Sequence, residues 1–325
     1  DPVFGYNDGH LLYPERLAEF FDGDKLRQAQ EALSRFLRQA FGGDSPGPYY
    51  ALLHADGDHM GQIIAEQRTI EQHRALSRAA SLFAQKVEPI VKPARGSLIY
   101  AGGDDVLALL PLPNALDCAR ALAEAFSTQM SDFAITDPES GKAVQPTLSV
   151  GLAVVHHLEP LSEALELVRG AESYAKSVKG KNALAVTLSK RAGSERTVGG
   201  TWGSFDQRLE WFIGLHRNEE IPAELGYELR SSAMELEGAG EGPNDLLQQM
   251  MSLEVRWILS RKRAERGSRE VNEDVVRRLV DIMNQDDVPV MQLADELIIA
   301  REFASAARRT GASLPDARPG EGEKR

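Results

Sequence analysis

Residues 98–110 read LIYAGGDDVLALL, in which two apolar runs of strand length flank two glycines and two aspartates. Apolar strands joined by a tight turn of glycine and aspartate are typical of a β-hairpin. Turn chemistry alone would explain these residues, because both types are favoured in turns. Adjacent carboxylates are also the chemistry of a ligand site, so the rest of the chain has to separate a plain hairpin from a functional one.

The elements expected around this hairpin define the fold. Apolar periodicity predicts, in order, a buried strand over 49–55, a helical stretch over 63–91 with a break near 67–73, the hairpin, a helix capped by Asn114, a strand over 147–155, a helix over 161–179 and a strand over 183–188. The order β-α-β-β-α-β is that of the ferredoxin-like, split βαβ fold. We expect its two helices to cover one face of the sheet and to leave the other open for a ligand or partner.

The domain organisation follows from a change in character near residue 190. Residues 1–48 have the composition of a leading segment, and 49–190 carry the ferredoxin-like pattern. After the Gly/Ser-rich stretch RAGSERTVGGTWGS, every periodic stretch over 205–310 is helical. The tail 311–325 has almost no apolar residues, which predicts disorder. The expected fold class is therefore α+β, with an all-α domain at the C-terminal end.

Composition excludes several classes of protein. The chain is 42% hydrophobic and 26% charged, as in ordinary soluble proteins, and no apolar run is long enough to span a membrane. Cys118 is the only cysteine, which excludes an internal disulfide and a cysteine zinc site and fits a reducing, cytoplasmic location. The chain begins Asp-Pro-Val without an initiator Met or a signal peptide, which indicates an excised piece of a longer protein.

Charge is distributed unevenly. The net charge of −12 argues against a protein that coats nucleic acid over its whole surface. Residues 169–196 nevertheless hold seven Lys and Arg against two Glu, and a second basic run lies over 261–269. Such segments favour a local anionic partner, such as a polyphosphate or a phosphate backbone, and a solvated surface is the alternative for each.

A second acidic stretch follows the first predicted strand. HADGDHMG over 54–61 places Asp56 and Asp58 on the same side of an extended chain, because strand side chains alternate with a period of two. Gly57 and Gly61 allow the backbone to approach a ligand closely. A split βαβ fold sets the first strand beside the hairpin, so both acidic stretches are expected at one place.

Four carboxylates would then converge, namely Asp56, Asp58, Asp104 and Asp105, beside the glycine pair Gly102 and Gly103. They repel one another unless a cation lies among them, and hard oxygen ligands suit Mg²⁺ or Mn²⁺. Two such ions can hold a triphosphate and activate an attacking hydroxyl. One such stretch alone is best explained as a polar loop, but two stretches that the fold brings together favour a site.

Two further features surround the expected site. Small residues follow one face of the strand at 147–155, which leaves room for a base or ribose that Ser149 can hydrogen-bond; close packing against a neighbouring element is the alternative. Lys176 and Lys179 are three residues apart on a helix, and Lys181 follows a glycine turn. Lysines at a helix end beside such a turn can reach β- and γ-phosphates.

Four motifs together resemble a known domain: AGGDD after a strand, the upstream ADGDxMG, the LSVGLA strand and the AKxxKGKN segment. They are similar to the Palm polymerase/cyclase domain shared by GGDEF-type diguanylate cyclases and the large subunit of type III CRISPR effector complexes. Asp104, Asp105 and Val106 after the glycines resemble the GGDD form of the CRISPR subunit. The helical domain ending in LIIAREFASAARR is similar to its type III-B version, so the resemblance covers 49–310.

The resemblance implies a nucleotidyltransferase that binds two ATP molecules between paired Palm domains and links them into cyclic oligoadenylate when the complex holds target RNA. Asp56, Asp104 and Asp105 would be ligands of Mg²⁺ or Mn²⁺, with Asp58 in support. Nucleotide contacts would come from Gly57, Gly61, Gly102, Gly103, Ser149 (to adenine), Lys176, Lys179 and Lys181. The helical domain would pack on small subunits along the guide RNA–target RNA duplex, and a guide-tag-binding subunit would be a further partner.

The chain departs from this family in its extent. No His-Asp dinucleotide is present and no other Palm domain precedes residue 49, so the chain resembles the C-terminal half of the subunit, without its companion Palm domain. One alternative is a non-catalytic scaffold that binds ATP or only holds RNA and subunits. Another is a stand-alone diguanylate cyclase, which Val106 and the helical domain disfavour. Four aspartates favour catalysis, because a scaffold has no reason to gather repelling carboxylates.

Overall fold

The computed structural model describes residues 9–41, 46–136, 143–191, 193–237, 250, 253–259, 271–285 and 288–310. The tail over 311–325, predicted to be disordered, lies outside the described residues, and so does the basic run over 261–269. Within these ranges no helix is long and apolar enough to cross a membrane.

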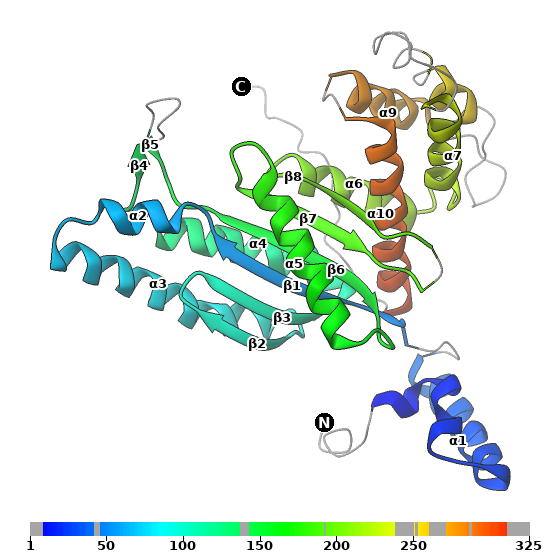
Figure 1. Ribbon diagram of the computed structural model, residues 1–325. Helices are drawn as coiled ribbons and strands as arrows, with labels where there is room; N and C mark the ends of the chain where they lie inside the picture. The colour runs from blue at the N-terminus through cyan, green and yellow to red at the C-terminus, as the bar shows by residue number, and fades with distance from the viewer. Residues whose placement is uncertain are drawn as a thin grey trace, which may run out of the picture.

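A six-stranded sheet with the order β2-β3-β1-β6-β7-β8 forms the centre of the molecule (Figure 1). Its strands are β1 (Tyr49–Gly57), β2 (Ser97–Gly102), β3 (Asp105–Pro111), β6 (Leu148–His156), β7 (Ala183–Leu188) and β8 (Arg196–Thr201). The first four strands in this order pair antiparallel, β6 and β7 pair parallel, and β8 adds an antiparallel edge. The predicted hairpin is β2–β3, and the predicted ferredoxin-like α+β fold is confirmed.

Helices α3 (Ile70–Val91) and α4 (Leu112–Gln129) cover one face of this sheet. Alternate residues of β1 and β3 point into that layer, where the rings of Phe83 and Phe126 meet edge to face at 5.0 Å. The predicted break in the long helical stretch is real: α2 (Met60–Glu66) ends there, and α3 begins with a capping box of Thr69 and Gln72.

The expectation that the opposite face stays open is wrong for β1, β6 and β7, because α5 (Leu161–Ser177) packs on these strands (Figure 1). Small residues of β6 allow this approach. A Cβ added to Gly151 would lie 2.8 Å from the Cα of Glu172 on α5, a contact that real structures do not show. The small-residue face of β6 therefore serves helix packing, as in the alternative considered above.

The edge strand β2 contains an irregularity. Leu98 pairs with Ala108 and Tyr100 with Leu107, so Ile99 is an extra residue, a β-bulge. The bulge turns Tyr100 to the sheet face that carries α5, and its ring is about half exposed, at 51%. A small ribbon of β4 (Ile135–Thr136) and β5 (Ala143–Val144) lies outside the main sheet.

The C-terminal part is helical, with α6 (Phe205–Arg217), α7 (Leu225–Glu237), α9 (Glu273–Gln285) and α10 (Val290–Thr310). Its apolar residues belong to the same hydrophobic cluster as the α3–α4 layer. Arg120 of α4 donates to Asp206 and Glu210 of α6, each at 2.8 Å, and so ties the helices to the sheet domain. The Gly/Ser-rich boundary predicted over 191–204 contains strand β8, which the sequence pattern had not indicated.

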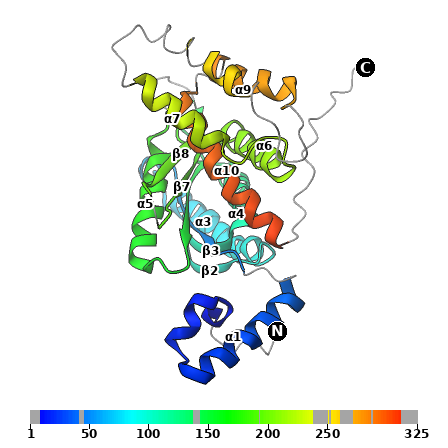
Figure 2. The same ribbon diagram turned by 90° about the vertical axis from the view of Figure 1, so that its right-hand side faces the viewer.

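The leading segment forms two 3₁₀ helices (Gly9–Leu12 and Pro14–Glu19) and α1 (Gly23–Phe41), with a small core of Leu17, Leu33 and Leu37. The Tyr13 ring stacks on His157 at 3.8 Å, just after β6. Figure 2 shows this segment at the end of the molecule opposite α7 and α9.

Candidate active site

Three of the predicted carboxylates lie together where β1 ends and the β2–β3 hairpin turns. Gly57 makes this possible, since a Cβ there would lie 2.9 Å from Asp104 Oδ2. Burial raises the pKa of Asp104 above its ordinary value, and the negative charges of Asp56 and Asp105 raise it further; a backbone hydrogen bond and Lys176 act in the opposite direction. The structure therefore brings Asp56, Asp104 and Asp105 close enough for their charges to interact.

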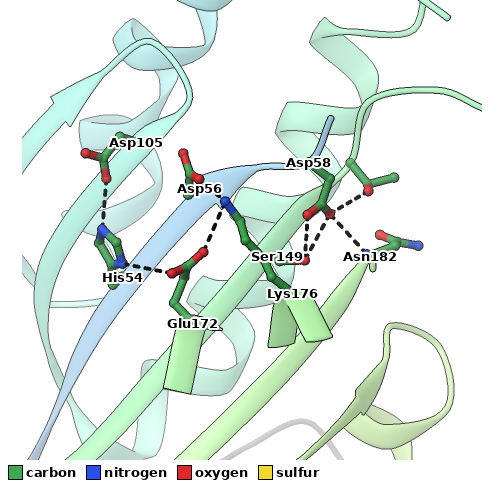
Figure 3. Close-up of polar contacts among 9 residues, drawn as sticks. His54, Asp56, Asp58, Asp105, Ser149, Glu172, Lys176 and Asn182 are labelled. Atoms are coloured by element: carbon green, nitrogen blue, oxygen red, sulfur yellow. Dashed lines mark hydrogen bonds and ion pairs between the residues drawn. The ribbon is translucent and has the colours of Figure 1, made fainter. Parts of the chain in front are cut away.

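Lys176, on the last turn of α5, is the cation that meets this cluster. Its ammonium group donates a hydrogen bond to Asp56 and lies 3.1 Å from Glu172 Oε1 (Figure 3). Burial lowers the pKa of Lys176, but the hydrogen bond and charge of Asp56, followed by those of Glu172, outweigh burial and raise it. Lys176 is therefore firmly protonated and offsets part of the negative charge.

Asp105 has a partner that the sequence reasoning missed. His54 on β1 places Nε2 3.1 Å from Asp105 Oδ1 and Nδ1 4.0 Å from Glu172 Oε2. The geometry at Asp105 Oδ1 is not that of a hydrogen bond, and this buried oxygen accepts none from the described residues. His54 precedes Asp56 by two residues on one strand, and Glu172 precedes Lys176 by one helical turn. These two spacings are the signals that would have identified both residues.

Asp58 plays a different part from Asp56. It is fully buried, and its carboxylate accepts hydrogen bonds from Thr147 Oγ1 at 2.7 Å, Ser149 Oγ at 2.9 Å and the Asn182 N–H at 3.0 Å (Figure 3). β1 ends at Gly57, so Asp58 turns toward β6 and the loop after α5. With its oxygens occupied by these donors, Asp58 is a structural support and is not arranged as a metal ligand.

Ser149 is also fully buried, and both of its hydroxyl contacts go to Asp58. A direct contact of Ser149 with adenine does not fit this arrangement, because α5 fills the space beside the strand. The reason is the one that explains Gly151: of the two interpretations of the small residues, the structure supports close packing, because α5 is seated on them.

The remaining predicted residues are placed as follows. Gly103 has a φ of 70° in the hairpin turn, a conformation that favours glycine. The space where a Cβ on Gly102 would lie is taken by the Tyr100 hydroxyl, whereas Gly61 faces open space. Lys179 is exposed, and Lys181 has a φ of 54° in the loop that Asp58 holds through Asn182.

The side chains at this site decide which kind of metal binding is possible. Across the described ranges, no three His, Cys, Asp or Glu side chains are gathered closely enough to enclose a metal ion. Mg²⁺ does not need such an enclosure, because it usually binds through one or two carboxylates together with water and substrate phosphates. One or two carboxylates from the set Asp56, Asp104 and Asp105 would be enough for this mode of binding.

A split βαβ sheet with carboxylates at the end of its first strand and at the adjacent hairpin turn defines a palm-type domain. Residues 49–185 match the family model of the Cas10/Cmr2 second palm domain. Residues 49–185 are therefore similar to the second palm domain of the Cas10/Cmr2 family, which confirms the resemblance predicted from its motifs.

Known proteins extend this likeness. The CRISPR system Cmr subunit Cmr2 of Pyrococcus furiosus is 29% identical over 305 residues, which cover 81% of this chain and 32% of that protein. The chain therefore spans about a third of the length of this relative.

Solved structures share the fold. A type III-B Cmr-beta complex bound to cognate target RNA contains a chain that matches with a TM-score of 0.51 and 13% identity, over 90% of this chain and 42% of that one. A Csm1–Csm4 cassette in complex with cA4 matches with a TM-score of 0.50 and 16% identity, over 79% of this chain and 36% of that one.

Proposed function

We propose that this chain supplies a nucleotidyl-transferring palm to a type III CRISPR effector complex, where ATP is joined into cyclic oligoadenylate in response to target RNA. The observation that carries the proposal is the convergence of Asp56, Asp104 and Asp105 at one end of the sheet beside Lys176. The palm fold and the solved relative in complex with cA4 support it.

In this proposal Asp56, Asp104 and Asp105 hold Mg²⁺ or Mn²⁺. Such ions supply Lewis-acid stabilisation of phosphate charge and activation of the attacking hydroxyl. Burial raises the pKa of Asp104, and the charges of Asp56 and Asp105 raise it further; these neighbouring negative charges also favour a bound cation, which supports the assignment.

The chain's own residues would bind and orient the nucleotide. Lys176, on the last turn of α5, and Lys179, just after it, would contact the phosphates. The loop carrying Lys181 is fixed through Asn182 and Asp58. Gly61 and Gly103 would allow the backbone to approach the ligand, whereas the space beside Gly57 is taken by Asp104. Ser149 acts here by holding Asp58 in place, and the adenine contact once expected of it is not part of the proposal.

The proposed partners follow the family. A second Palm domain would complete the site, and the small subunits, the guide-tag-binding subunit, guide RNA and target RNA would assemble around the chain in the cytoplasm. The helical part presents exposed apolar side chains for such contacts, among them Met234, Leu253 and Trp257.

The test is to assemble the chain with its companion Palm domain, the other subunits and a guide, and to supply labelled ATP or GTP with and without target RNA. We expect RNA-dependent cyclic oligoadenylate from ATP, and none after the double change Asp104→Ala and Asp105→Ala. Asp132→Ala, at an exposed aspartate outside the two acidic stretches, is the matched control and should retain synthesis. Near-normal synthesis by the double variant would refute the catalytic role, and an assembled but silent parent complex would favour the scaffold.

A further inference from the structure

Acidic and basic side chains alternate along one line of the candidate site. Asp56 is bound by Lys176, Lys176 lies 3.1 Å from Glu172, Glu172 lies 4.0 Å from His54, and His54 lies 3.1 Å from Asp105 (Figure 3). The line joins Asp56, near the end of β1, to Asp105, the first residue of β3 after the hairpin turn. Its centre is α5, which contributes both Glu172 and Lys176.

Glu172 is the fixed member of this line. Gly151 is the cross-strand neighbour of His54, and at this point the α5 backbone sits directly on β6. Glu172 is only 8% exposed and is held against the sheet by this contact. Its carboxylate therefore cannot move far from His54.

Lys176 is the movable member. Its side chain is 27% exposed, and its flexible four-carbon stem lies on the final turn of α5. It binds Asp56 at a carboxylate oxygen that a divalent cation would use. Two cations cannot share that oxygen at hydrogen-bonding distance without strong repulsion.

We propose that Lys176 is an exchangeable counter-ion of the site. Without a metal ion, Lys176 neutralises Asp56; when a divalent cation binds to Asp56, Lys176 is released from it, stays near Glu172 and becomes free to contact nucleotide phosphates. The proposal rests on the proposed function, since it assumes that Asp56 is a metal ligand.

The exchange makes metal and nucleotide binding cooperative. A metal ion that displaces Lys176 makes a cation available to phosphates, and a nucleotide that attracts Lys176 leaves Asp56 free for metal. Because such coupling is reciprocal, each ligand should raise the affinity for the other through this one side chain. Glu172 is the positioning residue that keeps Lys176 within reach of both.

The test is direct Mn²⁺ binding to the chain, followed by electron paramagnetic resonance of free Mn²⁺, with and without a non-hydrolysable ATP analogue. We expect Lys176→Met to bind Mn²⁺ on the order of tenfold more tightly than the parent without nucleotide, because a competing cation is gone. The same variant should lose the gain in Mn²⁺ affinity that the analogue gives the parent. Lys176→Arg keeps the competing charge and should resemble the parent. Arg169→Met removes an exposed positive charge from the same helix and should also leave Mn²⁺ affinity unchanged.

Circular dichroism would verify that each variant is folded, and Asp56→Asn would establish that the measured ion binds at this site. Parent-like or weaker Mn²⁺ binding by folded Lys176→Met would overturn the exchange while leaving the proposed function intact. If neither the parent nor Lys176→Met binds Mn²⁺ in a manner that depends on Asp56, both proposals fail.

Discussion

The contact between α5 and β6 at Gly151 makes a sharp prediction. Gly151→Ala adds a methyl group that would lie 2.8 Å from both the Cα of Glu172 and the carbonyl oxygen of Val168. These are backbone atoms, so no side-chain rotation relieves the clash, and α5 must move away from the sheet. Overpacking of this kind costs about 1–3 kcal/mol, and we expect the free energy of unfolding to fall by that amount.

Gly170 provides a matched control on the same helix, because a Cβ there meets nothing within 4 Å. Gly170→Ala should raise the free energy of unfolding by about 0.5–1 kcal/mol, since alanine favours a helix more than glycine does. Urea denaturation followed by circular dichroism measures both changes. If Gly151→Ala is as stable as the parent, or shifts in the same direction as Gly170→Ala, the close approach of α5 to the sheet is not as described.

Three further predictions concern buried or crowded polar groups. Asp58→Ala leaves the donors of Thr147, Ser149 and Asn182 without their acceptor. The free energy of unfolding measured in urea should therefore fall by about 2–4 kcal/mol. A loss below about 1 kcal/mol would contradict the role of Asp58 as a support. The raised pKa of Asp104 means that the folded protein holds the carboxyl proton of Asp104 more tightly than the unfolded chain does, so ionisation of this group lowers stability as pH rises. Metal-free Asp104→Asn should therefore melt at a higher temperature than the parent at pH 7. This difference in melting temperature should vanish well below pH 3.8. Burial lowers the pKa of His216 from 6.5 to about 4, so the unfolded chain takes up a proton at a higher pH than the folded protein does. The free energy of unfolding should therefore fall by about 3 kcal/mol as pH drops from 6.5 to about 4. In urea titrations at several pH values, His216→Asn should flatten this fall, whereas the exposed His73→Asn should not.

The convergence of the acidic stretches was predictable from the sequence because it depends on topology alone. In a split βαβ order the hairpin must lie beside the first strand, so Asp56 and Asp104 meet whatever the details of packing. The sequence also shows that Gly57 lies between two acidic residues. The need for glycine at this position comes from the close approach of Asp104, which is visible only in three dimensions.

The cover over the second sheet face was missed because the prediction considered only the two helices of the ferredoxin-like core. The β6–α5–β7 unit is a crossover between parallel strands, and such a crossover must place its helix on one face of the sheet. The alternation rule also failed for Asp58, because it holds only while the strand continues and β1 ends at Gly57. His54 begins the HADGDHMG stretch, but the prediction considered only the aspartates and glycines of that stretch. Glu172 escaped notice because it stands in no acidic or glycine-rich motif.

The bulge at Ile99 has a consequence for how any companion domain reaches the hairpin turn. β2 is a terminal strand of the sheet, and its free edge lies on the side away from β3. An extra residue in an edge strand disturbs the ladder of backbone donors and acceptors that a further strand would need. The sheet is therefore guarded against growth at that side, and a domain that met the hairpin turn would contact side chains around the turn instead of continuing the sheet.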